Sequence, residues 1–148
     1  MSEKIEQELM LLNRLYKEED ELYRDYAVKI GVSATEFWIL YTLCTSVEPC
    51  SQRMLSELWF YPKQTINSAI RKLMGAALVV LIPVEGRRNQ KIVRLTDKGE
   101  AFCSEKVRPL IKAENTAFLQ FSEEERALIL TLFKKQINCL KIEFDRID

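Results

Sequence analysis

The chain has 148 residues, four cysteines, no histidine and a formal net charge of zero. This length fits one domain with a real hydrophobic core. Without histidine, the protein has no histidine-based metal site and no histidine acid–base catalysis. No apolar run approaches the roughly 20 residues of a membrane span, and the polar, acidic N-terminus is unlike a secretory signal. We therefore expect a cytoplasmic protein whose widely spaced cysteines remain free thiols.

Only four glycines and four prolines interrupt the chain, which predicts a mainly helical protein. Apolar residues at helical spacing predict a first helix from about Glu3 to Ile30, with the acidic run at residues 18–21 on its solvated face. Ser33 and Glu36 have the spacing of a capping box. A buried, almost wholly apolar helix should follow over residues 34–45.

Two shorter helices, from about Ser51 to Leu58 and from Pro62 to about Ala76, form a helix-turn-helix pattern. The second helix should bury the row Ile66, Ala69, Ile70 and Leu73. Its outward face contains no acid. Residues 62–98 carry eight basic and two acidic side chains, a net charge of +6, so the rest of the neutral chain carries −6. Because phosphate binding needs a local basic surface, this distribution favours a nucleic-acid partner.

The segment after the second short helix predicts a β-hairpin, or wing. Its strands are Leu78–Ile82 and Lys91–Leu95, around a basic tip that contains Gly86. Residues 96–97 should cap a helix that kinks near Pro109. A capping box at residues 122–125 should start a final helix. The predicted fold is mainly α: a winged helix-turn-helix of three helices and a β-hairpin wing, flanked by N- and C-terminal dimerisation helices.

The order of these elements and the segments PKQTINSAIRKL (62–73) and IVRLTDKG (92–99) resemble the MarR (multiple-antibiotic-resistance regulator) family over nearly the whole chain. The resemblance implies a homodimeric transcriptional regulator that binds a pseudo-palindromic DNA operator. It also implies one domain, residues 1–148, with dimerisation helices at residues 1–30 and 100–148 and a DNA-binding lobe at residues 33–99. The family commonly has glycine where Ala77 stands. An alanine there costs on the order of 1 kcal/mol in a left-handed turn, unless the helix ends earlier, at Gly75.

By the same resemblance, the recognition helix enters the major groove and an arginine of the wing lies at the minor groove. Arginine can bond bidentately to guanine, and asparagine or glutamine to adenine. Either Arg87 or Arg88 can take the wing position. The predicted DNA-binding residues are Ser51, Gln52, Lys63, Gln64, Thr65, Asn67, Ser68, Arg71, Lys72, Arg87 and Arg88. A winged-helix module that binds protein instead of DNA is the alternative. An enzyme has almost no support, because the sequence offers no plausible nucleophile–base pair and no glycine-rich phosphate loop.

The family also places a small-molecule pocket between the dimer helices and the DNA-binding lobe. The candidate residues for a small aromatic or acidic ligand are Tyr26, Phe37, Trp38, Tyr41 and Phe102, although plain core packing is the favoured interpretation. No cofactor or metal is expected. Cys44 and Cys103 fall on apolar faces and are predicted to lie in the core, whereas Cys50 falls in a loop and is the more exposed candidate for an oxidant sensor.

Overall fold

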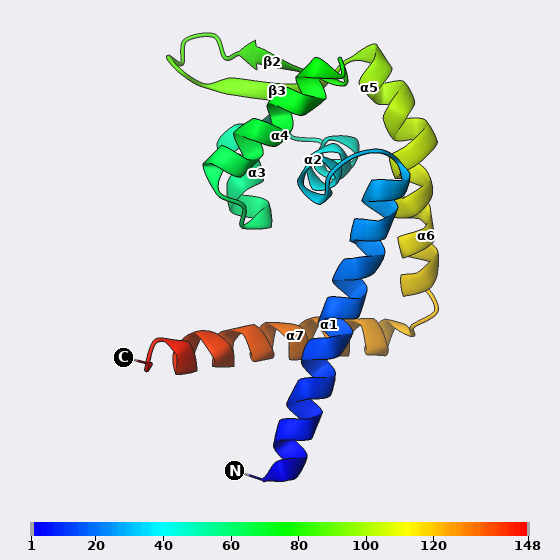
Figure 1. Ribbon diagram of the computed structural model, residues 1–148, viewed down its shortest axis with the longest axis vertical. Coiled ribbons are helices and arrows are strands. Elements are labelled where there is room, and N and C mark those ends of the chain that lie inside the picture. Colours follow the sequence, from blue (N-terminus) through cyan, green and yellow to red (C-terminus); the bar gives the residue numbers. More distant parts are fainter. Residues whose placement is uncertain (1, 148) are drawn as a thin grey trace. The chain divides into compact units, whose positions relative to one another are not determined.

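The computed structural model describes residues 2–147 of the chain, in two compact units (Figure 1). Unit 1 extends to Arg108, and unit 2 begins at Pro109. The end residues of the predicted domain, 1 and 148, lie outside the described residues. Helices and a small antiparallel sheet make up the chain, which confirms the predicted winged-helix fold class.

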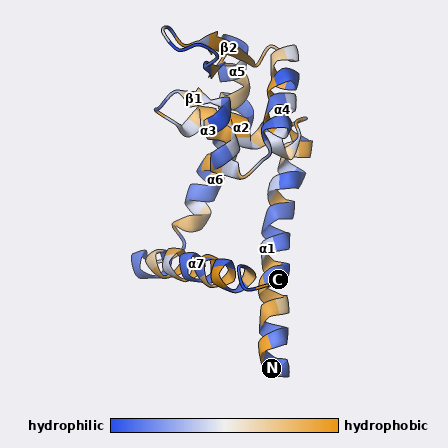
Figure 2. Cartoon of the chain, turned by 90° about the vertical axis from the view of Figure 1, so that its left-hand side faces the viewer, coloured by the Kyte–Doolittle hydropathy of each residue, from blue (hydrophilic) through white to orange (hydrophobic). Residues whose placement is uncertain are grey.

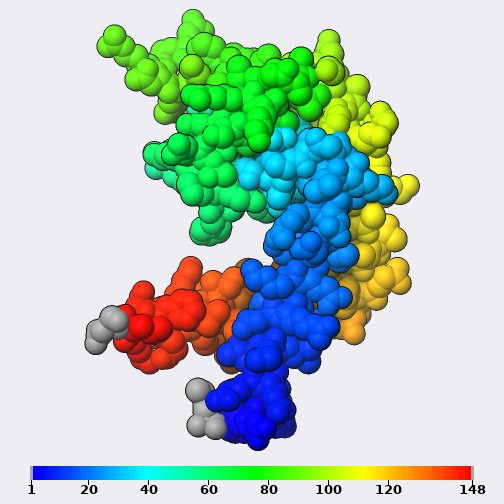
Figure 3. Space-filling model, in the orientation of Figure 1, coloured from blue at the N-terminus to red at the C-terminus, as the bar shows by residue number. Residues whose placement is uncertain are grey.

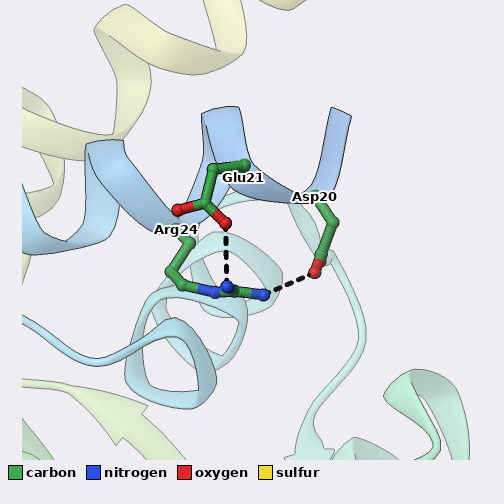
Figure 4. Close-up of polar contacts among 3 residues, drawn as sticks. All are labelled: Asp20, Glu21 and Arg24. Atoms are coloured by element: carbon green, nitrogen blue, oxygen red, sulfur yellow. Dashed lines mark hydrogen bonds and ion pairs between the residues drawn. The ribbon is translucent and has the colours of Figure 1, made fainter. Parts of the chain in front are cut away.

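The first helix, α1 (Glu3–Lys29), matches its predicted bounds closely. Its acidic run is solvated, as expected from the sequence. Arg24 donates to the carboxylate of Asp20, four residues earlier, and to that of Glu21, three residues earlier, both at 2.8 Å (Figure 4). All three side chains are more than half exposed, so these pairs support the helix only weakly.

The second helix, α2 (Ala34–Thr45), lies in the core of unit 1. The predicted capping box is present: the Ser33 hydroxyl accepts the Glu36 N–H at 3.2 Å, and the Glu36 carboxylate accepts the Ser33 N–H at 3.3 Å. Phe37, Ile39 and Leu40 are completely buried. Because α2 is apolar almost all round, the other helices of unit 1 can pack on several of its sides.

The helix-turn-helix consists of α3 (Gln52–Trp59) and α4 (Lys63–Gly75). The turn passes through Phe60, which has a left-handed backbone with φ 55°. Helix α4 begins at Lys63, one residue after its predicted start at Pro62, which is the N-cap instead. Its extended ψ of 144° places it outside the helix. The predicted inward row is confirmed, because Ile66, Ala69, Ile70 and Leu73 are all buried.

The wing consists of strands β2 (Val79–Pro83) and β3 (Lys91–Leu95), which pair antiparallel from Val79↔Leu95 to Pro83↔Lys91. The sequence did not predict a third strand, β1 (Cys50–Ser51), which pairs antiparallel with β3. The sheet order is β1-β3-β2. This pairing corrects one expectation: Cys50 opposes Val93 and is only 2% exposed, so it is not an exposed loop thiol.

The chain then forms α5 (Asp97–Phe102), a π-helical turn η1 (Cys103–Val107) and α6 (Arg108–Phe118). The kink expected near Pro109 takes the form of this π turn. The Arg108 N–H bonds to the Cys103 carbonyl, five residues back. Because Pro109 has no N–H to donate, the regular ladder is interrupted next to this widened turn.

The last helix, α7 (Glu123–Phe144), begins at a second capping box, in which the Ser122 hydroxyl accepts the Glu125 N–H at 3.1 Å. Neither α6 nor α7 contains a buried residue. Hydrophobic and hydrophilic residues alternate along α7, and also along α1 (Figure 2). No single helix among residues 2–147 is long and apolar enough to span a membrane. Only α1 and α2 taken together, bent by 87° at their junction, meet that test of length and composition.

The backbone just after α4 is strained at Ala77. Ala77 has φ 58°, its N–H bonds to the Met74 carbonyl, and the Leu78 N–H bonds to the Leu73 carbonyl, each at 2.9 Å. This is a Schellman motif with alanine at the left-handed position that normally holds glycine. Gly75 ends the helix without taking a left-handed φ itself.

We expect Ala77→Gly to raise the free energy of unfolding by about 1 kcal/mol, because glycine adopts this φ without the steric cost of a Cβ. Urea denaturation with an unchanged m-value measures the effect. The matched control is Ala76→Gly, where the right-handed φ of −82° should make glycine destabilising. Equal effects at the two positions would show that Ala77 is not strained.

Candidate nucleic-acid interface

The outward face of α4 is fully accessible to a ligand. All the predicted contact residues of this helix are exposed: Lys63, Gln64, Thr65, Asn67, Ser68, Arg71 and Lys72. Buried Ile66 and Ile70 hold the opposite face of the helix against the core. The exposed face therefore combines amides and an arginine, which can bond to base edges, with hydroxyls and lysines, which can bind phosphates, and it contains no acid.

A polar pocket lies beside α4, where the start of α3 and the end of the wing approach it. It is lined by Ser51, Gln52, Arg53, Lys63, Asn67, Asn89, Gln90 and Lys91. Four of these residues were predicted to bind DNA. The predicted set leaves out the other four residues: Arg53, Asn89, Gln90 and Lys91. The pairing of β1 with β3 brings the start of α3 beside the wing, and local sequence does not reveal such a long-range pairing.

Two side chains of this pocket are already engaged within the protein. The Ser51 hydroxyl caps α3 by accepting the Met54 N–H at 3.1 Å, so it retains its proton for donation to an acceptor such as a phosphate. Arg53 donates to the Glu57 carboxylate at 2.7 Å, and this hydrogen bond raises the pKa of the guanidinium. Lys63 and Lys91, both exposed, are the freer cations of the pocket.

A second polar pocket lies where the start of α2 meets the outward side of α4. It is lined by Ser33, Thr35, Glu36, Gln64, Thr65, Ser68, Ala69 and Lys72. The Lys72 ammonium lies 4.0 Å from the carboxylate of Glu36, whose side chain belongs to the capping box of α2 and is only 11% exposed. Because this carboxylate offsets part of the positive charge of Lys72, Arg71 is the stronger anion-binding group at this end of α4.

The wing tip presents Arg87 and Arg88 to solvent, and Figure 3 shows the wing (green) projecting from the body of unit 1. Gly86 and Asn89 have left-handed backbones, with φ 74° and 68°, and give the tip its tight turn. Arg87 donates to the Gln90 side chain at 3.3 Å. Arg88 makes no side-chain hydrogen bond to any residue in the described range 2–147, so its guanidinium is the more available of the two.

A set of hydrogen bonds fixes the end of α4 to the start of α5. The Lys98 ammonium donates to the Ala76 carbonyl at 2.9 Å. Thr96 donates twice: its hydroxyl to the Ala77 carbonyl at 2.5 Å, and its N–H to the Leu78 carbonyl at 3.0 Å. The oxygen of the Thr96 hydroxyl also accepts the Gly99 N–H, and Thr96 thereby caps α5. We call these hydrogen bonds the α4–α5 clasp. It gives a physical reason for Thr96 and Gly99 in the segment IVRLTDKG (92–99).

Most of the aromatic residues proposed for a ligand pocket do come together. Trp38 packs against Trp59 with ring centroids 4.4 Å apart, and Phe37 and Tyr41 contact Trp38. Tyr26 packs against Phe37 and donates its hydroxyl to the Lys106 carbonyl at 2.6 Å. Phe102, in α5, makes no ring contact with this cluster among the described residues.

Comparison with known proteins decides the family. A model described as the MarR family matches residues 30–88, from the end of α1 to the wing tip. The chain is 31% identical over 116 residues to the HTH-type transcriptional regulator PecS of Dickeya dadantii, and the match covers 74% of this chain and 70% of that protein. The chain belongs to the MarR family.

Solved MarR structures share the fold along almost the whole chain. A MarR family regulator from Neisseria meningitidis superposes with a TM-score of 0.80 at 18% identity, covering 95% of this chain and 99% of that one. The MepR–DNA complex of S. aureus superposes with a TM-score of 0.69 at 17% identity, covering 88% and 96%. Both comparisons show that this chain has the MarR fold.

Proposed function

We propose that this MarR family protein is a transcriptional regulator that binds operator DNA through the outward face of α4. The observation that carries the proposal is the exposed, acid-free face of that helix, flanked by a polar pocket on each side. PecS, a relative over most of the chain, is a transcriptional regulator by name, and MepR has the same fold in a complex with DNA. These relatives support DNA, and not a protein surface, as the partner of this face.

Each part of the surface has its own role in this proposal. Gln64 and Asn67, one turn apart on α4, read adenine edges in the major groove, and Arg71 reaches a guanine or a phosphate. The pocket between α3 and the wing holds the DNA backbone through Lys63, Lys91, Ser51 and Gln52. Arg87 and Arg88 hold the backbone or a narrow minor groove beyond it.

We also propose that the protein acts as a homodimer through residues 1–30 and 100–148. In the single chain, large apolar side chains of α1 and α7 remain open to solvent: Leu9 is 44% exposed, Leu128 56% and Leu132 54%. Helices with such uncovered apolar rows normally pack against another surface. A two-fold dimer would present two copies of α4, which requires an operator with two-fold pseudo-symmetry.

For a small-molecule effector, we propose contact with the half-buried rim of the aromatic cluster, at Tyr26, Trp38 and Tyr41. The ring of Phe37 is completely buried and packs against its neighbours, so it belongs to the core. The packing of the rings against one another supports a structural role for most of the cluster.

Selection of bound duplexes from a random DNA pool tests the proposal. We expect a pseudo-palindrome whose half-site centres lie about one helical turn, ~34–36 Å, apart. Affinity for the selected duplex should fall steeply with salt, and a scrambled duplex should bind more weakly at every salt concentration. Sedimentation of the complex should give two chains for each duplex. No enriched sequence, together with salt-insensitive binding, would instead support the protein-binding module.

A further inference from the structure

A hollow in unit 1 lies where the end of α2, the loop of residues 46–49 and strand β3 meet. Its volume is about 270 Å³, and its walls include Leu43 from α2, Val47 and Glu48 from the loop, and Leu95 from β3. The hollow shares no lining residue with the two polar pockets beside α4. None of the predicted DNA-binding residues lines it. Its chemistry is therefore separate from that of the candidate nucleic-acid interface.

The hollow exists because β1 covers only one end of β3. The pairing of these strands includes Cys50↔Val93 and does not extend to the residues before Cys50. In the same register, Glu48 would lie opposite Leu95. The main chain of Glu48 bonds locally instead: its N–H donates to the Ser46 hydroxyl oxygen at 3.3 Å, and its carbonyl accepts the Ser46 hydroxyl at 3.1 Å. The last residue of β3 therefore has no neighbouring strand on this side.

This end of β3 directs main-chain groups into the hollow. In an antiparallel pair, successive residues direct their N–H and C=O alternately toward the partner strand and away from it. The Thr96 N–H bonds to the Leu78 carbonyl and the Val84 N–H to the Gln90 carbonyl, each at 3.0 Å, so the even-numbered residues of β3 face β2. Leu95 therefore directs its N–H and C=O away from β2. Within residues 2–147, neither group has a hydrogen-bond partner.

A ligand can make the two hydrogen bonds that a longer β1 would make. Leu95 offers one donor and one acceptor, side by side, in the arrangement of an extended strand. A ligand complements both when it carries an N–H donor and a carbonyl on neighbouring carbon atoms, as an amino-acid residue does. The half-buried Leu43 and the exposed Val47 give an apolar side chain of such a ligand a surface to contact.

The charges beside Leu95 favour a cation on the ligand. Glu48 and Glu100 both line the hollow, and the Glu100 carboxylate is already paired with Arg108 at 3.4 Å. Glu48 is exposed and forms no ion pair with any residue in the range 2–147. Arg94 also lines the hollow, but its side chain lies on the opposite face of the sheet from that of Leu95. An ammonium group can therefore bind the Glu48 carboxylate and the Leu95 carbonyl together.

We propose that this hollow, between the 46–49 loop and the end of β3, binds small α-amino amides with an apolar side chain. The ligand's ammonium donates to the Leu95 carbonyl and to the Glu48 carboxylate. Its carbonyl accepts the Leu95 N–H, and its side chain lies against Leu43 and Val47. The small volume suits a ligand of the size of one amino acid. The site does not depend on the proposed DNA binding.

The test uses the full-length protein labelled with nitrogen-15, and L-leucinamide as the probe. Titration followed by NMR should show a saturable shift of the Leu95 amide resonance. The Kd should be on the order of 1 mM, because the ligand is small and the hollow is open. The absence of a saturable shift at Leu95 would overturn the proposal, and this measurement needs no variant.

Two control compounds separate the contacts of the probe. Isopentylamine has the same ammonium and branched side chain but no carbonyl, so it should give no saturable shift in the same concentration range. N-Acetyl-L-leucinamide keeps the carbonyl and loses the charge, and it should bind roughly threefold more weakly, as expected for an exposed ion pair. Binding of either control as tight as that of L-leucinamide would contradict the assigned contacts.

Two variants test the same contacts from the protein side. Leu95→Pro removes the outward N–H but no hydrogen bond to β2, and it should abolish binding, as followed at the Val47 amide. Circular dichroism checks that this variant folds. Glu48→Gln should weaken binding about threefold. The matched control, Glu85→Gln, removes the same charge from the exposed wing tip and should bind as the wild type does. Equal affinities for Glu48→Gln and Glu85→Gln, or full affinity in a folded Leu95→Pro, would overturn the proposal.

Discussion

Gly99→Ala should lower the free energy of unfolding by roughly 3 kcal/mol or more, enough to leave much of the protein unfolded. A Cβ on Gly99 would overlap the Leu78 carbonyl oxygen and lie 3.2 Å from a methyl carbon of Leu95. The carbonyl cannot move aside, because it accepts the Thr96 N–H within the α4–α5 clasp. The substitution must therefore separate the end of α4 from the start of α5.

Gly75→Ala is the matched control for this substitution. Gly75 is the last residue of α4, has no left-handed φ, and has no atom within 4 Å of the position of an added Cβ. Alanine there should be neutral or stabilising by up to about 1 kcal/mol, because it is the better helix former. Thermal and urea denaturation of both variants measure the difference. Similar stabilities for the two variants would mean that the close approach at Gly99 is not a real constraint.

Gln64→Ala or Asn67→Ala should weaken operator binding by ~1–3 kcal/mol and relax the preference at one base pair in each half-site. Both side chains are exposed on α4, whose buried face they do not contact, so the fold should be unaffected. Binding to random DNA should change little, since amides that read bases contribute little to a non-specific complex. The measurement is operator and random-duplex affinity at several salt concentrations.

The joint replacement of Arg87 and Arg88 by alanine should instead weaken binding without much loss of sequence preference. Affinity for operator and random DNA should fall more nearly alike, and the salt dependence should flatten by about one unit of slope for each phosphate that the variant no longer neutralises. Lys17→Ala with Lys29→Ala removes the same charge from exposed positions of α1 and serves as the control. If alanine at all four positions (Gln64, Asn67, Arg87 and Arg88) leaves the affinity for operator and random DNA unchanged, the lobe of residues 33–99 is not the DNA-binding surface.

Local sequence was sufficient to predict the helices of this protein. The capping boxes at Ser33 and Ser122 and the cap at Thr96 all form as expected. Each depends only on residues three positions apart, so neighbouring residues alone specify it. The buried row of α4 follows equally from helical periodicity, and its complement, the exposed polar face, is the candidate site.

Tertiary structure decided the features that depend on residues far apart in the chain. Strand β1 is two residues long and carries no strand pattern of its own, and it exists only because β3 pairs with it. That pairing buries Cys50 and brings Arg53 beside Lys91. Sequence therefore determined which face of each helix is polar, because periodicity is local. Only the folded chain determined which polar groups share a site, because that depends on the packing of residues distant in sequence.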